Sequence, residues 1–297
     1  MKRFFALLVV LSLLCALVAP AAAQEASPAA TGSLLAAMGF PELHITAHDD
    51  SYEVPAQVDA GRTLIVFENL GQESNHALLV RLPEGVSAEE ALASPSSESE
   101  EPPAWFADVR FPGFAGETLP GQTSYAVVDL APGVHLILSD VTASFEVVGE
   151  ATTPTAANEP AADAMVDLFE YGFAIPDAVA PGRQVWKVTN SGEMPHELLL
   201  VWSPEPVTYD QIFEMLTNES EDENATPVGG GPSFAEMEPV GGLGWLSPGA
   251  AGWTEVDLRP GTYVALCFVV DMETGMLHVQ HGMIDVFTVG EAATPAS

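Results

Sequence analysis

The chain has 297 residues, 47% of them hydrophobic, and a formal net charge of -34 with only 8 Lys and Arg. So large a negative charge argues against binding nucleic acid or an anionic membrane surface, because both attract basic proteins. The chain begins with Lys2 and Arg3, followed by an apolar run and the small-residue stretch "APAAAQ". This pattern predicts a signal peptide, residues 1–23, cleaved near Ala23. We therefore expect an exported protein that is periplasmic, extracellular or at the cell surface.

Two further features bear on the compartment and on the chemistry. Beyond the leader, no apolar run approaches the roughly 20 residues needed to span a membrane, so we expect no membrane span. Of the two cysteines, Cys15 lies in the leader and only Cys267 remains. An unpaired cysteine is unusual in an oxidising compartment. We therefore expect Cys267 to be buried, paired between molecules, or bound to something.

The chain contains an internal repeat. Both copies show an aromatic residue, an apolar-Pro pair, Gly-Arg, an alternating strand, Asn-x-Gly, a histidine and a run of leucines. His76 in the first copy corresponds to His196 in the second. The similarity also continues beyond the leucine runs. The matching segments are 52–80 with 173–201, and 119–138 with 247–266.

Short runs of β-branched and aromatic residues, separated by Pro-Gly and Asn-x-Gly turns, fill both copies. Such spacing predicts an all-β fold of two tandem antiparallel β-sandwiches. Each sandwich is expected to carry one short helical insertion, capped at its start by Ser87 or Thr208. The predicted segments are an N-terminal segment 24–43, a first domain 44–149, a linker 150–164, a second domain 165–290 and a tail 291–297.

The second copy resembles the cupredoxins, the plastocyanin- and azurin-like blue copper proteins. Three stretches carry the resemblance: "IPDAVAPGRQVWKVTNSGEMPHELLLV" (175–201), "LRPGTYVALC" (258–267) and "HVQHGMIDVFTV" (278–289). It covers nearly all of 165–290 and, more weakly, 44–149. It implies Greek-key β-sandwiches, and one type 1 copper ion per chain, held in the second domain by His196, Cys267, His278 and Met283.

The chemistry of these residues agrees with that implication. Two imidazoles, a thiolate and a long thioether contact suit copper in electron-transfer proteins. Side chains alternate along a strand, so Tyr263, Ala265 and Cys267 share one face. With Tyr263 pointing into the sandwich, the sulfur of Cys267 is expected to point inward near one end of the sandwich.

The loop between Cys267 and His278 departs from the commoner family pattern, because ten residues separate the two. The loop must fold back, and Thr274 with Gly275 supplies a turn for this.

Two ligand alternatives stay open on this loop. His281 is the competitor for the second imidazole, and Met276 is a weaker competitor for the thioether position. We prefer His278 because its spacing to Met283 is ordinary for the family, whereas the spacing from His281 to Met283 is very short.

The first copy lacks the ligand loop. Its residues 133–149, "GVHLILSDVTASFEVVG", run nearly straight from strand to strand without cysteine or methionine. His76 alone persists, and His135 takes the place of Tyr263. We expect this domain to keep the fold without a metal site, and His76 to be a polar loop residue.

These features predict an exported type 1 copper protein that transfers electrons through its second domain. Its partner would be a redox protein, and a basic surface on that partner would suit the acidic chain. The alternative is an extracellular binding module that is metal-free or sequesters copper. Phe268 follows Cys267, and the chain contains no His-x-His pair. The catalytic motifs of multicopper oxidases and copper nitrite reductases are thus missing, so we expect no enzyme activity.

Overall fold

The computed structural model describes residues 32–93, 103–139, 141–150, 159–217 and 231–290. The predicted signal peptide 1–23, the predicted tail 291–297 and most of the predicted linker lie outside these residues. Strands predominate in the described chain, so the predicted all-β class is confirmed. Among the described residues, no helix is long and apolar enough to cross a membrane.

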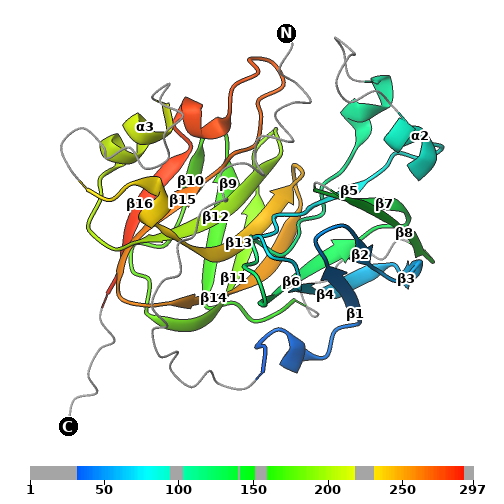
Figure 1. Ribbon diagram of the computed structural model, residues 1–297, viewed down its shortest axis with the longest axis horizontal. Coiled ribbons are helices and arrows are strands. Elements are labelled where there is room, and N and C mark those ends of the chain that lie inside the picture. Colours follow the sequence, from blue (N-terminus) through cyan, green and yellow to red (C-terminus); the bar gives the residue numbers. More distant parts are fainter. Residues whose placement is uncertain (1–31, 94–102, 140, 151–158, 218–230, 291–297) are drawn as a thin grey trace.

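One eight-stranded sheet runs through both repeats (Figure 1). From each edge to the middle of the sheet, the strands of the two repeats follow the same order. Equivalent strands of the two repeats therefore lie at equal distances from the centre of the sheet. In both halves the first long strand pairs in parallel with the strand that contains the Gly-Arg motif. The strands in order are β10 (Gly172–Ala174), β9 (Ala164–Phe169), β11 (Gly182–Asn190), β14 (Ala251–Leu258), β6 (Thr123–Leu130), β4 (Gly61–Asn69), β1 (Glu42–Ala47) and β2 (Tyr52–Glu53).

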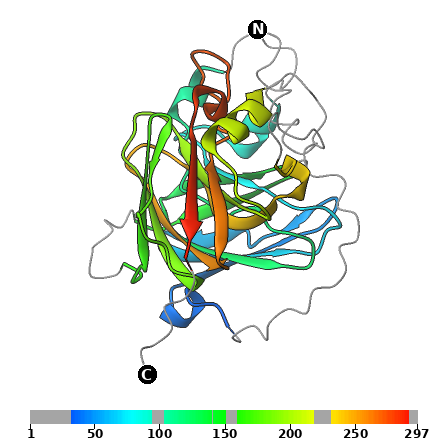
Figure 2. The ribbon, with the colours of Figure 1, turned by 90° about the vertical axis from the view of Figure 1, so that its left-hand side faces the viewer.

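Two four-stranded sheets pack against the two halves of the long sheet, as the side view also shows (Figure 2). Buried side chains of facing sheets, such as Trp186 and Tyr263, form the core between them. The second-repeat sheet is β13 (Glu238–Leu246), β12 (His196–Ser203), β15 (Gly261–Leu266) and β16 (Ile284–Val289). The first-repeat sheet is β3 (Gln57–Asp59), β8 (Thr142–Val148), β7 (Gly133–Leu138) and β5 (Leu78–Arg81).

The two repeats join edge to edge around a local two-fold axis. Strands β6 and β14 pair antiparallel, and Ala126 lies opposite Thr254, its counterpart in the repeat. A second contact places the 111–116 segment of the first repeat beside β13, where the Gly244 amide donates to the Phe114 carbonyl at 2.9 Å. The repeats therefore share backbone hydrogen bonds and one continuous core. The predicted domain boundaries stay a prediction.

Strand β12 is buried on both faces, which explains its apolar run "LLLV". Leu198 and Leu200 point into the sandwich core, whereas Leu199 and Val201 contact a second apolar cluster. This cluster includes Ile212 of helix α3 (Tyr209–Thr217), so the helical insertion covers the outer face of the sheet.

Short helices occupy the remaining connections. Helix α2 (Ala88–Ala93) and helix α3 are capped as predicted, since Ser87 Oγ accepts the Glu90 amide at 3.1 Å and Thr208 Oγ1 accepts the Gln211 amide at 3.3 Å. The 3-10 segments are η2 (Ala36–Met38), η3 (Ala104–Asp108), η5 (Phe234–Glu236) and η6 (His278–His281). Segment η6 lies beside α3 at one end of the molecule (Figure 1).

His135 is a buried titratable group in the core of the first repeat. Its ring stacks on Phe145, its Nδ1 lies 3.1 Å from the Gly133 carbonyl oxygen, and its Nε2 has no hydrogen-bond partner among the described residues. Burial, with a smaller contribution from the positive charge of Arg81, lowers the pKa of His135 to about 4.

This low pKa predicts acid sensitivity. The unfolded chain takes up a proton at His135 below a pH of about 6.5, whereas the folded chain does so only near pH 4. Stability from this group is thus complete above the unfolded pKa and decreases as the pH falls. We expect the free energy of unfolding to drop by about 2 kcal/mol between pH 7 and pH 5 from His135 alone. Urea denaturation of wild type and His135→Phe at both values isolates this contribution, and parallel pH dependences would contradict it.

Candidate metal centre

His196 begins strand β12 and is positioned by the preceding turn. The Asn190 side chain donates to the carbonyl oxygens of Met194 and Leu246, both at 2.8 Å, and its Oδ1 accepts the Gly192 amide at 2.9 Å. Asn69 makes the corresponding bonds in the first repeat. The Asn-x-Gly motif of both copies therefore fixes the turn that leads to the histidine.

Cys267 follows strand β15 and is fully buried. Tyr263, Ala265 and Cys267 are each 0% exposed and belong to one core cluster, so the predicted alternation is confirmed. The Glu197 amide, next to His196, donates to Cys267 Sγ at 3.4 Å. This bond ties the start of β12 to the end of β15.

The 268–277 loop folds back as a short hairpin. The Gly275 amide donates to the Asp271 carbonyl oxygen at 2.8 Å, and Gly275 has a positive φ of 72°, so the predicted turn forms. The buried Asp271 carboxylate accepts the Glu273 amide at 2.8 Å and the Thr274 hydroxyl at 2.7 Å. The hairpin returns the chain to the thiol, because the His278 amide donates to the Val269 carbonyl oxygen at 2.8 Å.

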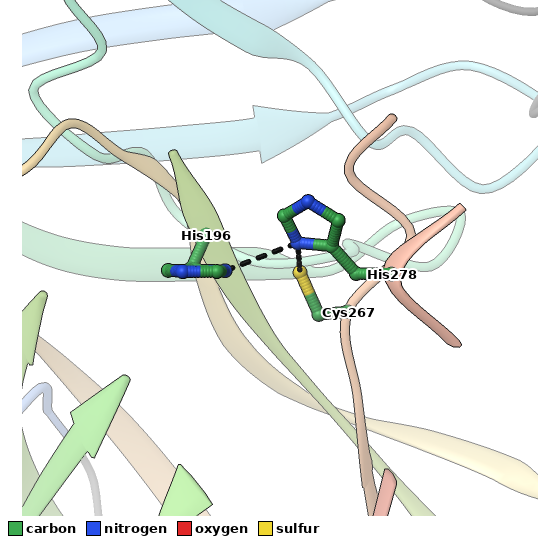
Figure 3. Close-up of side chains that lie close together, drawn as sticks. All are labelled: His196, Cys267 and His278. Carbon is green, nitrogen blue, oxygen red and sulfur yellow. Dashed lines mark hydrogen bonds between the residues drawn. The ribbon is translucent and has the colours of Figure 1, made fainter. Parts of the chain in front are cut away.

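Three predicted ligands converge at this end of the second repeat (Figure 3). Nδ1 of His196 lies 3.0 Å from Nδ1 of His278, which in turn lies 3.4 Å from Cys267 Sγ. All three side chains are buried, and their donor atoms lie within 4.8 Å of one another. The two imidazoles direct Nδ1 toward each other, and Nδ1 of His278 also faces the sulfur.

The other candidate residues differ in position. Met283 is 0% exposed and shares the core cluster of Cys267, and its amide donates to the His278 carbonyl oxygen at 2.9 Å. His281 instead places Nε2 2.9 Å from Thr274 Oγ1, outside the group of three. Met276 is exposed on the loop. Which of these residues bind a metal stays a prediction.

Burial sets the charge state of the three donors. It lowers the pKa of His278 to about 4, with a contribution from His196, and it lowers the pKa of His196 against the opposing charge of Glu170. Burial raises the pKa of the Cys267 thiol well above its usual value, and the Glu197 charge adds to the increase. Both imidazoles are thus neutral at pH 7 and keep a lone pair for a metal ion.

The donor set fits a copper ion. Metal bonds of about 2.0 Å to nitrogen and about 2.3 Å to sulfur, spread in a plane, place neighbouring donors roughly 3.5 Å apart. Two of the three donor pairs, at 3.0 and 3.4 Å, are close to that value, and the third lies within 4.8 Å. Nε2 of both histidines is buried without a hydrogen-bond partner among the described residues, and Glu170 Oε1 lies 3.7 Å from Nε2 of His196. A cation bound at the two Nδ1 atoms and the sulfur would take up the lone pairs that meet there, and each Nε2 would then carry the ring proton.

Three residues around the centre were not found from the sequence. Tyr171 is the one described non-glycine residue with positive φ. Its ring packs edge-on against His278, with ring centroids 5.4 Å apart, and lies at 30° to the ring of His281, with centroids 4.5 Å apart. Its hydroxyl donates to Asp271 at 3.2 Å. Asp271 and Glu197 are the other two residues, and the only sequence signal of Glu197 was an acidic residue inside an apolar run.

The comparisons with known proteins give solved structures only. No family model matches the chain, and no curated protein matches it. Auracyanin from Roseiflexus castenholzii is 20% identical with a TM-score of 0.27, covering 42% of this chain and 94% of its own. Copper nitrite reductase from Nitrosomonas europaea is 14% identical with a TM-score of 0.23, covering 84% and 92%. A multi-copper oxidase from Pediococcus acidilactici is 9% identical with a TM-score of 0.22, covering 87% and 61%.

These structures have cupredoxin folds, which is the fold that the sequence resemblance implied. They also correct one prediction. The chain was expected not to be an enzyme, but the neighbours that cover most of it are copper nitrite reductases and multicopper oxidases, which are enzymes. The missing His-x-His and Cys-His motifs argue against one arrangement of catalytic copper and do not exclude catalysis in general.

Proposed function

We propose that the chain is an exported type 1 copper protein that transfers electrons through one copper ion in its second repeat. The observation that carries this proposal is the convergence of His196, Cys267 and His278 in a buried group, with Met283 in the same core cluster. Copper held by such donors supplies one-electron exchange between Cu(I) and Cu(II).

The protein's own contribution is to hold the donors still. His196 is fixed by the Asn190 turn, Cys267 by the Glu197 amide, and His278 by the hairpin around Asp271. A donor set held by hydrogen bonds rearranges little when the charge of the metal changes, which favours fast electron exchange.

The partner is proposed to be a redox protein with a basic docking surface. Glu170, Glu193 and Glu273 are exposed carboxylates on the turns and loop around the centre. Together with the net charge of -34, they favour a cationic partner through long-range attraction.

Copper titration tests the proposal. Adding Cu(II) to the purified mature protein should give an intense visible thiolate-to-copper absorption that saturates at one equivalent. Metal analysis of the loaded protein should agree with that stoichiometry. Wild-type protein that gives no such absorption with Cu(II) would refute the proposal.

Copper sequestration is the second candidate, and the full burial of all three donors favours it. Voltammetry separates the two functions. A carrier should give a reversible one-electron wave with fast exchange, whereas a sequestering protein should bind copper tightly and exchange electrons slowly.

A further inference from the structure

The first repeat reaches the metal centre of the second through a hydrogen bond between His76 and the buried carboxylate of Glu197. His76 lies in the loop between β4 and β5, and its Nε2 is 3.1 Å from Oε2 of Glu197 on β12. The Glu197 side chain is 1% exposed and that of His76 is 23% exposed. A buried carboxylate is costly unless it is paired, so His76 stabilises Glu197 where it lies.

Glu197 in turn contacts both sides of the centre. It directly follows His196, its amide donates to Cys267 Sγ at 3.4 Å, and its Oε1 accepts the Phe268 amide at 2.8 Å. The carboxylate therefore holds the backbone just after Cys267, where the ligand loop leaves the sheet. Its second oxygen is the one that faces His76.

The repeat gives an internal comparison for this contact. His76 corresponds to His196 in the sequence alignment of the two copies. The strand pairing, with Leu78 opposite Leu138 and Leu199 opposite Leu266, gives His76 the strand position of Glu197. The first copy thus has the histidine without the carboxylate, and the second has the carboxylate that this histidine reaches. The contact exists only because the repeats are joined side by side.

We propose that His76 is a positioning residue for the metal centre: it holds the Glu197 carboxylate, which holds the backbone at Cys267 and Phe268 in place for the metal. This assigns a role to the first repeat. The metal-bound part of the proposal rests on the proposed function, whereas the positioning contact itself exists without metal.

Two measurements on the full mature chain test the contact. In the metal-free protein, His76→Leu should remove the partner of Glu197 Oε2 and weaken the hold of Oε1 on the Phe268 amide. The hydrogen exchange of the Phe268 amide should then accelerate at least about tenfold. In the copper titration, the same variant should bind Cu(II) about 10- to 100-fold more weakly, with a shifted absorption. His76→Gln keeps a donor toward Glu197 and should restore both properties toward wild type.

Two control variants separate positioning from general destabilisation. His44→Gln changes an exposed histidine of the same repeat that contacts Glu42, and it should alter neither property. Ile137→Val weakens the first-repeat core without touching the pair. If Ile137→Val accelerates Phe268 exchange as much as His76→Leu does, the effect is structural only and the proposal is overturned.

The remaining outcomes are also decisive. Unchanged Phe268 exchange in His76→Leu overturns the proposal, whatever happens to copper affinity, because His76 then does not act through Glu197. Accelerated exchange with unchanged copper affinity and absorption overturns the role at the metal. If wild-type protein binds no copper but exchange accelerates as expected, the contact stands and the proposed function fails.

Discussion

Replacing Cys267 with serine is expected to abolish the visible absorption of the copper-loaded protein. Serine has nearly the same size, but its hydroxyl stays protonated at neutral pH and gives no thiolate-to-copper transition. The affinity for copper should fall more than about 100-fold, since even residues that only support ligands typically cost 10- to 100-fold. The fold should persist, because serine is a close steric substitute that can keep the two long contacts of the sulfur, with the Glu197 amide and with Nδ1 of His278, both at 3.4 Å.

A pair of alanine variants identifies the second imidazole in the same assay. His278→Ala should remove the absorption, because Nδ1 of His278 lies 3.4 Å from the sulfur. His281→Ala should keep it, because His281 contacts Thr274 and Asp271 instead. The reverse outcome would show that His281 is the ligand, and an absorption that survives in Cys267→Ser would contradict a thiolate site altogether.

Much of this centre could be predicted from the sequence because its determinants are local. Strand alternation placed the sulfur of Cys267 inside the sandwich, and the repeat related His196 to His76. The turn at Gly275 was predictable because glycine readily adopts the positive φ found there. The choice between His278 and His281 rested on spacing alone, and neither spacing nor alternation describes how a ten-residue loop folds.

The sequence does not indicate how the two repeats pair with each other. Strands β6 and β14 pair through backbone groups, which every residue has. The side chains of Ala126 and Thr254 therefore do not indicate that these strands pair. The contact of His76 with Glu197 depends on that pairing and joins residues far apart in the chain. A histidine interpreted as a polar loop residue therefore proved to reach the neighbouring repeat.

A single methyl group at Gly242 should destabilise the protein severely. Gly242 on β13 has a φ of +137°, and a Cβ there would lie 1.9 Å from the carbonyl oxygen of Leu198 on β12. The methyl group cannot be accommodated unless the two paired strands separate. Gly116 of the first repeat also packs on this backbone, since its own Cβ would lie 2.8 Å from the Gly242 nitrogen. We expect Gly242→Ala to cost roughly 4 kcal/mol or more, the range of exceptional single substitutions.

Gly249→Ala is the control without the clash, and its left-handed φ strains alanine less than the φ of Gly242 does. Gly249 has a φ of +76° in the turn after β13, and a Cβ there meets nothing within 4 Å. Its cost should be about 1–2 kcal/mol, the penalty of a left-handed conformation for an ordinary residue. Chemical denaturation of both metal-free variants gives the difference, and equal losses would contradict a steric role for Gly242. Because β12 begins with His196, the Gly242→Ala protein that remains folded should also bind copper more weakly, whereas Gly249→Ala should bind it like wild type.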